Sequence, residues 1–159
     1  MPRRILLLTF FYPPDLSAGS FRAKALVDAL RAYRGKPVQV DVLTTQPNRY
    51  YEHASETQVF ESGDGVRVRR IRLPAHRSGF RDQAVAFVSF AWQAARYARD
   101  ERYDLVVATS SRLMTAVLGA WIAYRQGARL YLDIRDLFVE NLGELFSRPV
   151  SSMLMVGFG

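Results

Sequence analysis

Hydrophobic residues occur along the chain in two patterns. Some form short continuous apolar runs, and others recur at helical spacing within longer segments. Residues 5–8 are four consecutive aliphatic residues, which is typical of a central parallel strand covered on both faces. Pro13 and Pro14 end that run because proline lacks an amide hydrogen and has a fixed φ. Apolar residues then recur at helical spacing, so an amphipathic helix is predicted to begin near Gly19–Ser20.

The same two patterns repeat to the end of the chain. Further strands are predicted at 38–44, 66–73, 105–108 and 128–134, further helices at 80–99 and 112–126, and a long polar loop at 46–65. Strands that alternate with helices at this spacing indicate βαβ units. We therefore expect the α/β class, a Rossmann-like parallel sheet flanked by helices, with a ligand crevice outside the carboxyl ends of the strands.

Arginines occupy positions 67, 69, 70 and 72 of the strand predicted at 66–73. A basic stripe of this kind binds phosphate groups, or it protects an exposed edge strand from aggregation. No aromatic residues are interleaved with the arginines for base stacking, so an edge strand is the favoured interpretation.

The first loop carries the small residues 17–20 at the expected start of the first helix. A helix N-terminus with little side-chain bulk favours a phosphate or another anion near Gly19 and Ser20, although a plain turn and N-cap explain these residues equally well. The loop lacks the G-x-G-x-x-G pattern, and Thr44 and Thr45 stand where a dinucleotide-binding fold places an acidic residue. These differences argue against an NAD or FAD enzyme.

Polar residues also follow the later strands at the same edge of the sheet. Thr109 and Ser110 end one strand, and the segment 133–140 ends the next. Carboxylates there would accept hydrogen bonds from sugar hydroxyls, whereas an N-cap with an Arg–Asp pair is the structural alternative. The acidic candidates are Asp133, Asp136 and Glu140, with Arg135 between them.

The predicted loop 46–65 includes Asn48 and Tyr50. Amide and aromatic side chains suit contacts with a sugar or a lipid headgroup, and long loops in compact domains are often functional. A connector without a function remains the alternative for this segment.

Composition narrows the function classes. The chain has 159 residues and 49% hydrophobic content, enough for the core of one domain, and it has no cysteine for disulfides or thiolate chemistry. His53 and His76 lie far apart, so no histidine metal site is expected. The net charge of +7 is compatible with nucleic acid, anionic lipid or phosphorylated substrates. The arginines are not gathered on one recognition helix, so nucleic acid is not an expected partner.

The apolar stretches are shorter than the ~20 residues of a membrane span, and the run after Arg4 is needed as a strand rather than as a signal peptide. The helix at 80–99 has two apolar stripes, one for the sheet and one for a neighbouring helix or an anionic membrane surface. We expect a cytoplasmic protein, or one that is peripheral on the inner face of the cell membrane.

Five segments together resemble the N-terminal domain of family 4 glycosyltransferases, with the lipopolysaccharide and exopolysaccharide enzymes such as the WbuB group as the most similar members. They are residues 5–30, 40–51, 65–74, 103–123 and 131–142. The most specific parts are the loop from Tyr12-Pro13-Pro14 to Gly19 and the segment from Asp133 to Leu137.

The resemblance implies the N-terminal half of a GT-B fold, in which two Rossmann-like domains face each other across a cleft. It implies a retaining transferase that needs no metal or other cofactor and uses a nucleotide sugar and a polyprenyl-diphosphate-linked acceptor for bacterial cell-surface polysaccharide. By similarity, Gly19 and Ser20 approach the donor diphosphate. The acceptor contacts are assigned to Asn48, Tyr50, Thr109, Ser110 and Arg135, and the catalytic candidates remain Asp133, Asp136 and Glu140.

Two features depart from that family. Phe138 and Val139 replace the Trp-Pro of its Asp-Leu-Trp-Pro-Glu segment, and the chain stops at Gly159 without a second domain. We expect residues 1–159 to be an acceptor-side domain that lacks the donor-binding domain and is inactive alone. A non-catalytic Rossmann-like module that binds an anion or a partner is the alternative.

Overall fold

The computed structural model describes residues 2–33, 35, 37–47, 58–74, 80–109 and 113–134. Nine elements follow one another along these residues. They are β1 (Arg3–Leu8), α1 (Ala18–Ala32), β2 (Val38–Thr45), β3 (Phe60–Gly63), β4 (Val66–Ile71), α2 (Phe80–Arg99), β5 (Leu105–Thr109), α3 (Leu113–Gln126) and β6 (Arg129–Asp133).

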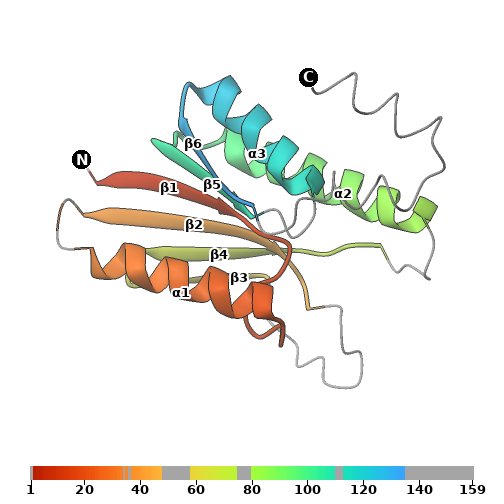
Figure 1. Cartoon of the computed structure of the whole chain (residues 1–159), viewed down its shortest axis with the longest axis horizontal. Coiled ribbons are helices and arrows are strands. Elements are labelled where there is room, and N and C mark those ends of the chain that lie inside the picture. Colours follow the sequence, from red (N-terminus) through yellow and green to blue (C-terminus); the bar gives the residue numbers. More distant parts are fainter. Residues whose placement is uncertain are drawn as a thin grey trace.

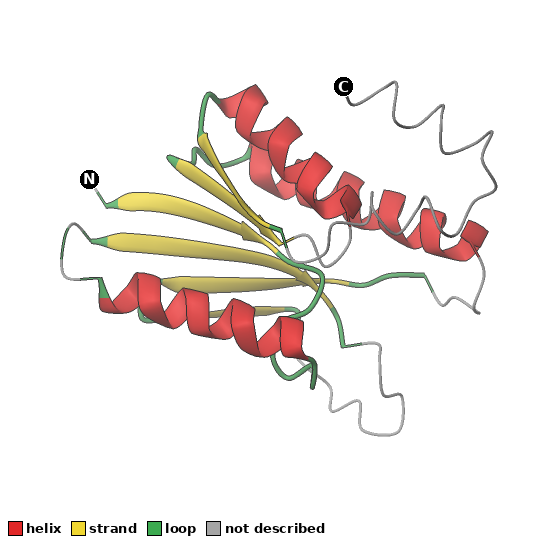
Figure 2. Ribbon diagram, in the orientation of Figure 1, coloured by secondary structure: helices red, strands yellow, loops and turns green. Residues whose placement is uncertain are grey.

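The strands form one sheet in the order β3-β4-β2-β1-β5-β6. All neighbouring strands run parallel except β3, which pairs antiparallel with β4. Helix α1 covers one face of the sheet, and α2 and α3 cover the other (Figure 1). The ribbon therefore has three layers, helix, sheet and helices (Figure 2). This architecture confirms the predicted α/β class with a parallel sheet flanked by helices.

The uniformly apolar β1 is buried because its alternate residues serve the two faces. Leu6 and Leu8 pack with α2 and α3, whereas Ile5 and Leu7 pack with α1. Gly119 of α3 lies so close to β5 that an added Cβ would stand 2.6 Å from the Cβ of Ala108. A glycine at this position therefore allows α3 to approach the sheet closely.

One sequence prediction about the sheet is wrong. The arginine-bearing strand β4 is not an edge strand, because it lies between β2 and β3. The edge strand β3 falls inside the segment predicted as a long loop, and a turn at Asp64 and Gly65, both with positive φ, joins it to β4. The β4 arginines consequently face the interior of the fold on both sides of the sheet, rather than an open edge.

A partly buried group of charged and polar side chains lies near the end of α2, and Asp41 and Tyr103 are its buried members. We call it the Asp41 cluster: Arg4, Asp41, Arg67, Glu101 and Tyr103. The Asp41 carboxylate accepts a hydrogen bond from Arg67 Nε at 2.6 Å and one from the Tyr103 hydroxyl at 2.9 Å. Glu101 accepts from Arg67 Nη2 at 2.9 Å and also from Arg4. The cluster joins three strands to the segment between α2 and β5 and leaves its two carboxylates compensated by two arginines.

The Asp41 cluster is expected to make the free energy of unfolding depend on pH in the acidic range. The hydrogen bond from Arg4 and that from Arg67 lower the pKa of Glu101 from 4.5 to about 2. Because the folded-state pKa is depressed, the stabilisation is fully present above pH 4.5 and is lost as pH falls toward about 2. Urea unfolding between these pH values should show a steeper loss of stability for the wild type than for Glu101→Gln. Equal slopes for the two proteins would contradict this prediction.

Candidate functional site

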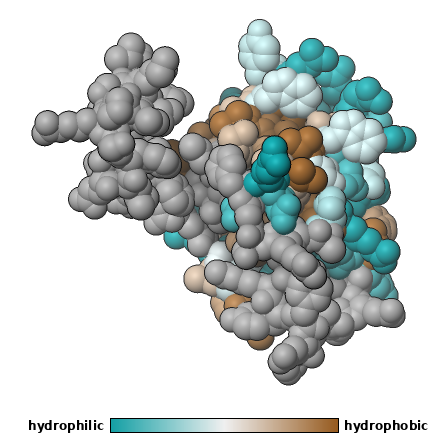
Figure 3. Space-filling model, turned by 90° about the vertical axis from the view of Figure 1, so that its right-hand side faces the viewer, coloured by the Kyte–Doolittle hydropathy of each residue, from teal (hydrophilic) through white to brown (hydrophobic). Residues whose placement is uncertain are grey.

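The candidate site lies at the carboxyl ends of β1 and β5, where the connecting helices change from one face of the sheet to the other. From β1 the chain crosses through α1 to β2 on one side, while β5, on the other side of β1, is flanked by α2 and α3 on the opposite face. The carboxyl ends of β1 and β5 therefore meet at a topological switch point, where open α/β sheets bind ligands. Figure 3 looks onto this carboxyl edge and shows a hydrophobic area between hydrophilic side chains.

Two threonines join the strands at the switch point. Thr109 Oγ1 donates a hydrogen bond to Thr9 Oγ1 at 3.1 Å, and Thr9 Oγ1 donates to the carbonyl of Phe11 at 3.0 Å. Both threonines are buried. The structure places Thr109 at the expected edge, but its hydroxyl is engaged in holding the first loop. The predicted contact of Thr109 with an acceptor remains a prediction.

Arg70 fixes the same loop from the side of β4. Its side chain is buried and donates to the carbonyl of Pro13 at 2.7 Å, to that of Gln58 at 3.1 Å and to Glu61 Oε1 at 2.7 Å. These bonds compensate the charge and both Nη groups of the buried arginine, whereas its Nε has no hydrogen-bond partner among the described residues. Arg70 thus helps to set the path of the loop that leads to α1, although the sequence pattern suggested a surface role.

The first turn of α1 is open to the carboxyl edge. The helix begins at Ala18, and Ser17 is the N-cap, because its side chain accepts a hydrogen bond from the amide of Ser20 at 3.2 Å. The helix thus starts one residue before the predicted start near Gly19–Ser20. Ser20 is fully buried, and its amide is already used by the cap. The amides of Ala18 and Gly19 belong to the helical positions that have no acceptor within a helix.

An ion pair links α1 to the end of β6. Arg22 Nη2 lies 2.6 Å from Asp133 Oδ1, and Arg22 Nε lies 3.0 Å from Asp133 Oδ2. This two-point geometry fixes the orientation of the carboxylate as well as its charge. The Asp133 side chain is 9% exposed and that of Arg22 is 61% exposed. Of the three catalytic candidates, Asp133 is the one that lies within the described residues. Arg22 compensates the charge of its carboxylate at the carboxyl edge of the sheet.

Several predicted site residues lie outside the described residues, and their roles remain predictions. They are Asn48, Tyr50, Ser110, Arg135, Asp136 and Glu140. Within the described ranges, the structure brings the start of α1, Thr109 and Asp133 to one edge, as the sequence predicted. In that same part of the chain, no three His, Asp or Glu side chains are grouped to hold a metal ion.

Two residues at this edge were missed by sequence reasoning. Thr9 directly follows a buried strand, which is the same signal that selected Thr109 on β5. Arg22 gave no signal, since its partner Asp133 is 111 residues away and only the folded topology brings them together.

Comparison with solved structures finds similar folds. Two crystal structures of the C-terminal domain of PF1911 hydrogenase from Pyrococcus furiosus are 13% identical, with TM-scores of 0.50 and 0.49, and the matches cover 83% and 82% of this chain and 93% and 90% of those chains. A UGT transferase from Siraitia grosvenorii in complex with UDP is 18% identical with a TM-score of 0.43, and the match covers 81% of this chain and 27% of that one. At these identities the likeness concerns the fold alone.

Comparison with curated protein sequences gives no significant match. The sequence does match the family described as "Glycosyl transferase 4-like domain" over residues 22–155. The match includes Arg22, Thr109 and Asp133 and every strand from β2 to β6, and it starts just after the first turn of α1. The chain therefore belongs to the glycosyl transferase 4-like domain family.

Proposed function

We propose that this chain is the acceptor-side domain of a GT-B glycosyltransferase, which transfers a sugar from a nucleotide-sugar donor to a lipid-linked glycan acceptor. The family match is the observation that carries the proposal. The switch point at the carboxyl ends of β1 and β5 supports it, because ligands of open α/β sheets bind at such points. The proposal also includes retention of the anomeric configuration, transfer without a metal ion and a role in bacterial surface polysaccharide synthesis.

The first turn of α1 suits the departing diphosphate. A sugar transfer of this kind proceeds through a transition state in which negative charge develops on the leaving group, so donors aimed at that charge lower the barrier. The exposed Ala18 and half-buried Gly19 present main-chain amides at a helix N-terminus, where an anion is stabilised. We assign the donor diphosphate to the amide of Gly19, and to Ser20 only as the residue that closes the first turn.

The carboxyl end of β6 suits the acceptor. Asp133 is held at the end of β6 by Arg22, so its carboxylate has a fixed direction. A fixed carboxylate orients a sugar hydroxyl for attack, and orientation contributes a large part of the rate of a transfer reaction. Thr109 lies at the same carboxyl edge, and its hydrogen bond to Thr9 ties the start of the first loop to β5.

The test is transfer of radiolabel from a panel of UDP- and GDP-sugars to a membrane lipid extract by the full-length protein that contains this chain. Label should enter the lipid fraction with the wild type. Gly19→Trp should reduce transfer at least about tenfold, because its indole would occupy the space in front of the first-turn amides. Gly19→Ala is the matched control, since Gly19 lies within α1 and a methyl group suits a helical backbone.

Two outcomes would contradict the proposal. Transfer by Gly19→Trp at the wild-type rate would remove the first turn from the donor site. No transfer from any donor, together with binding of phosphate-bearing ligands by the purified chain, would favour a non-catalytic binding module.

A further inference from the structure

Helices α2 and α3 expose large apolar side chains on the side that faces away from the sheet. Three of them recur on α2 and four on α3 at spacings of three and four residues, so each set forms one stripe along its helix. The exposed residues are Val85, Val88, Trp92, Met114, Val117, Trp121 and Tyr124. We call this surface the α2–α3 face.

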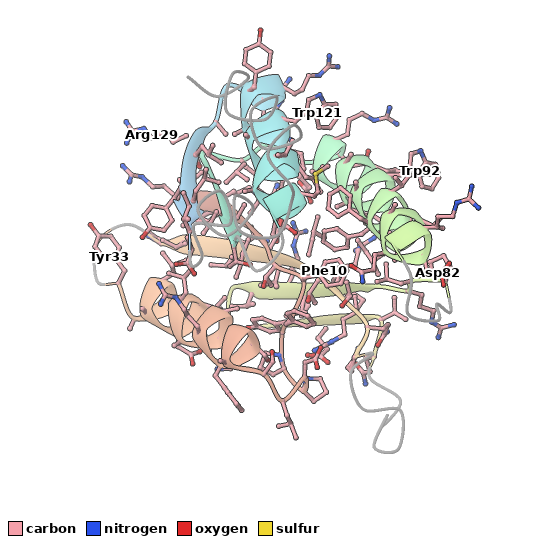
Figure 4. All side chains as sticks on the ribbon, turned by 45° about the vertical axis from the view of Figure 1, so that its right-hand side comes forward. Phe10, Tyr33, Asp82, Trp92, Trp121 and Arg129 are labelled. Atoms are coloured by element: carbon pink, nitrogen blue, oxygen red, sulfur yellow. The ribbon has the colours of Figure 1, made fainter. Side chains whose placement is uncertain are left out.

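Both tryptophans of the chain belong to the α2–α3 face. Trp92 is 64% exposed and Trp121 is 50% exposed, although tryptophan is a residue that folded proteins usually bury extensively. In Figure 4 the two side chains project from α2 and α3 away from the sheet. The inner sides of the helices are fully used, because Phe90 and Ala94 of α2 and Ile122 of α3 are buried in the core.

The two stripes form one surface. The helices contact each other, and the last turns of both line a common hollow that includes Ala95, Arg99, Trp121 and Arg125. Since α2 and α3 each connect parallel strands in the same direction, their exposed stripes run side by side along the same face of the protein.

Arginines accompany the apolar residues of this face. Helices α2 and α3 contain Arg81, Arg96, Arg99 and Arg125 and a single acidic residue, Asp82. The guanidinium of Arg96 lies 5.7 Å from the Trp92 ring centre, and that of Arg125 lies 5.9 Å from the Trp121 ring centre. The face thus combines aromatic rings with positive charge that acidic side chains on these helices do not compensate.

Helix α1 on the opposite face provides an internal comparison. Its exposed side carries charges of both signs that are paired, Lys24 with Asp28 on the same helix at 2.6 Å and Arg31 with Asp64 of the β3–β4 turn at 3.0 Å. This is the ordinary surface of a soluble helix. Among the described helices, α2 and α3 alone combine a repeated stripe of exposed apolar side chains with an excess of arginines over acidic residues.

We propose that the α2–α3 face binds the surface of an anionic lipid bilayer, with both helices lying in the interface. Tryptophan is favoured at the boundary between headgroups and acyl chains, where its ring is buried and its N–H stays near water. Arginine stems lie along apolar surface while their charged ends meet anionic headgroups. The charge of the face selects an anionic membrane over a second copy of this chain, whose own face would repel it.

Among the described helices, none is long and apolar enough to cross a membrane. The inferred contact is therefore one of helices lying on the bilayer. It would bring the start of α2 and α3, at the carboxyl edge of the sheet, close to the headgroups. The inference does not depend on the proposed transfer reaction, because it concerns lipid binding alone.

The experiment is co-flotation of the purified chain with vesicles, combined with its tryptophan emission. Mixed vesicles of phosphatidylcholine and phosphatidylglycerol should bind the chain and shift the emission to shorter wavelength, since both tryptophans leave water. Vesicles of phosphatidylcholine alone should bind it at least about tenfold more weakly, and Arg96→Gln with Arg99→Gln should weaken binding to the mixed vesicles by a similar factor. Trp92→Ser with Trp121→Ser should also lower co-flotation strongly.

The matched control is Tyr33→Ser, which removes an aromatic side chain of similar exposure, 66%, at the end of α1. It should bind mixed vesicles like the wild type. Circular dichroism of each variant separates loss of binding from loss of folding. Equal binding to both kinds of vesicle, or wild-type binding by the folded arginine or tryptophan variants, would overturn the proposal. An emission shift that needs only a higher protein concentration would assign the face to self-association instead.

Discussion

Replacing Asp41 by alanine should destabilise the fold by about 3–5 kcal/mol, the cost of removing one partner of a buried ion pair and leaving the other uncompensated. The side chain of Asp41 is 8% exposed and accepts hydrogen bonds from Arg67 and Tyr103. Without it, the Arg67 guanidinium keeps only Glu101 as an acidic partner within the Asp41 cluster, and the Tyr103 hydroxyl loses its acceptor. Urea unfolding followed by circular dichroism measures the change in the free energy of unfolding.

The control for this prediction is Asp28→Ala, which breaks an exposed ion pair with Lys24 on the surface of α1. Exposed pairs contribute about 1 kcal/mol or less, so this variant should unfold close to the wild type. Asp41→Asn keeps the size of the side chain and should fall between the two. If Asp41→Ala and Asp28→Ala cost the same, the buried cluster does not stabilise the fold in the way that its geometry indicates.

Replacing Arg22 by alanine should lower sugar transfer by the full-length protein about 100-fold, the scale of loss expected from a small misplacement of a reacting group. Arg22 orients Asp133 through two hydrogen bonds at the end of β6. We regard Arg22 as a positioning residue, so its loss should reduce kcat more than it raises KM. Because lysine cannot make the two-point contact, Arg22→Lys should restore only part of the rate.

Two further variants separate this role from a general structural effect. Lys24→Ala removes another exposed basic residue from the same helix, one that pairs with Asp28, and should leave transfer unchanged. Arg22→Ala combined with Asp133→Asn should be no slower than the slower single variant, because the two residues act as one pair. Additive losses in the double variant would show that Arg22 and Asp133 act independently.

The fold was largely predictable, because buried parallel strands and amphipathic helices carry strong local patterns. The helix predicted at 80–99 is confirmed with the same bounds, and the helix predicted at 112–126 is observed as Leu113–Gln126. Strand β3 was missed because Phe60–Gly63 is short and contains polar residues and a glycine. Such a strand forms through its antiparallel partner rather than through its own pattern.

The Asp41 cluster could in principle have been predicted from the sequence, but it was not. Asp41 is the single charged residue in the middle of β2, and β4 places Arg67 beside it in the parallel register. A lone acid inside a buried strand signals an internal partner. The contact of Arg22 with Asp133 had no such signal, since the sequence alone gives neither the strand order nor the position of α1 over the sheet.

The pairing of β1 with β5 has a consequence for folding. It joins residues that are about 100 positions apart, as the bond between Thr9 and Thr109 illustrates. Closing so long a loop costs entropy before any contact repays it, whereas the β3–β4 hairpin forms between near neighbours in the chain. We therefore expect the hairpin to form early and the β1–β5 pairing late, so that the candidate site is completed only when the last long-range contact is made.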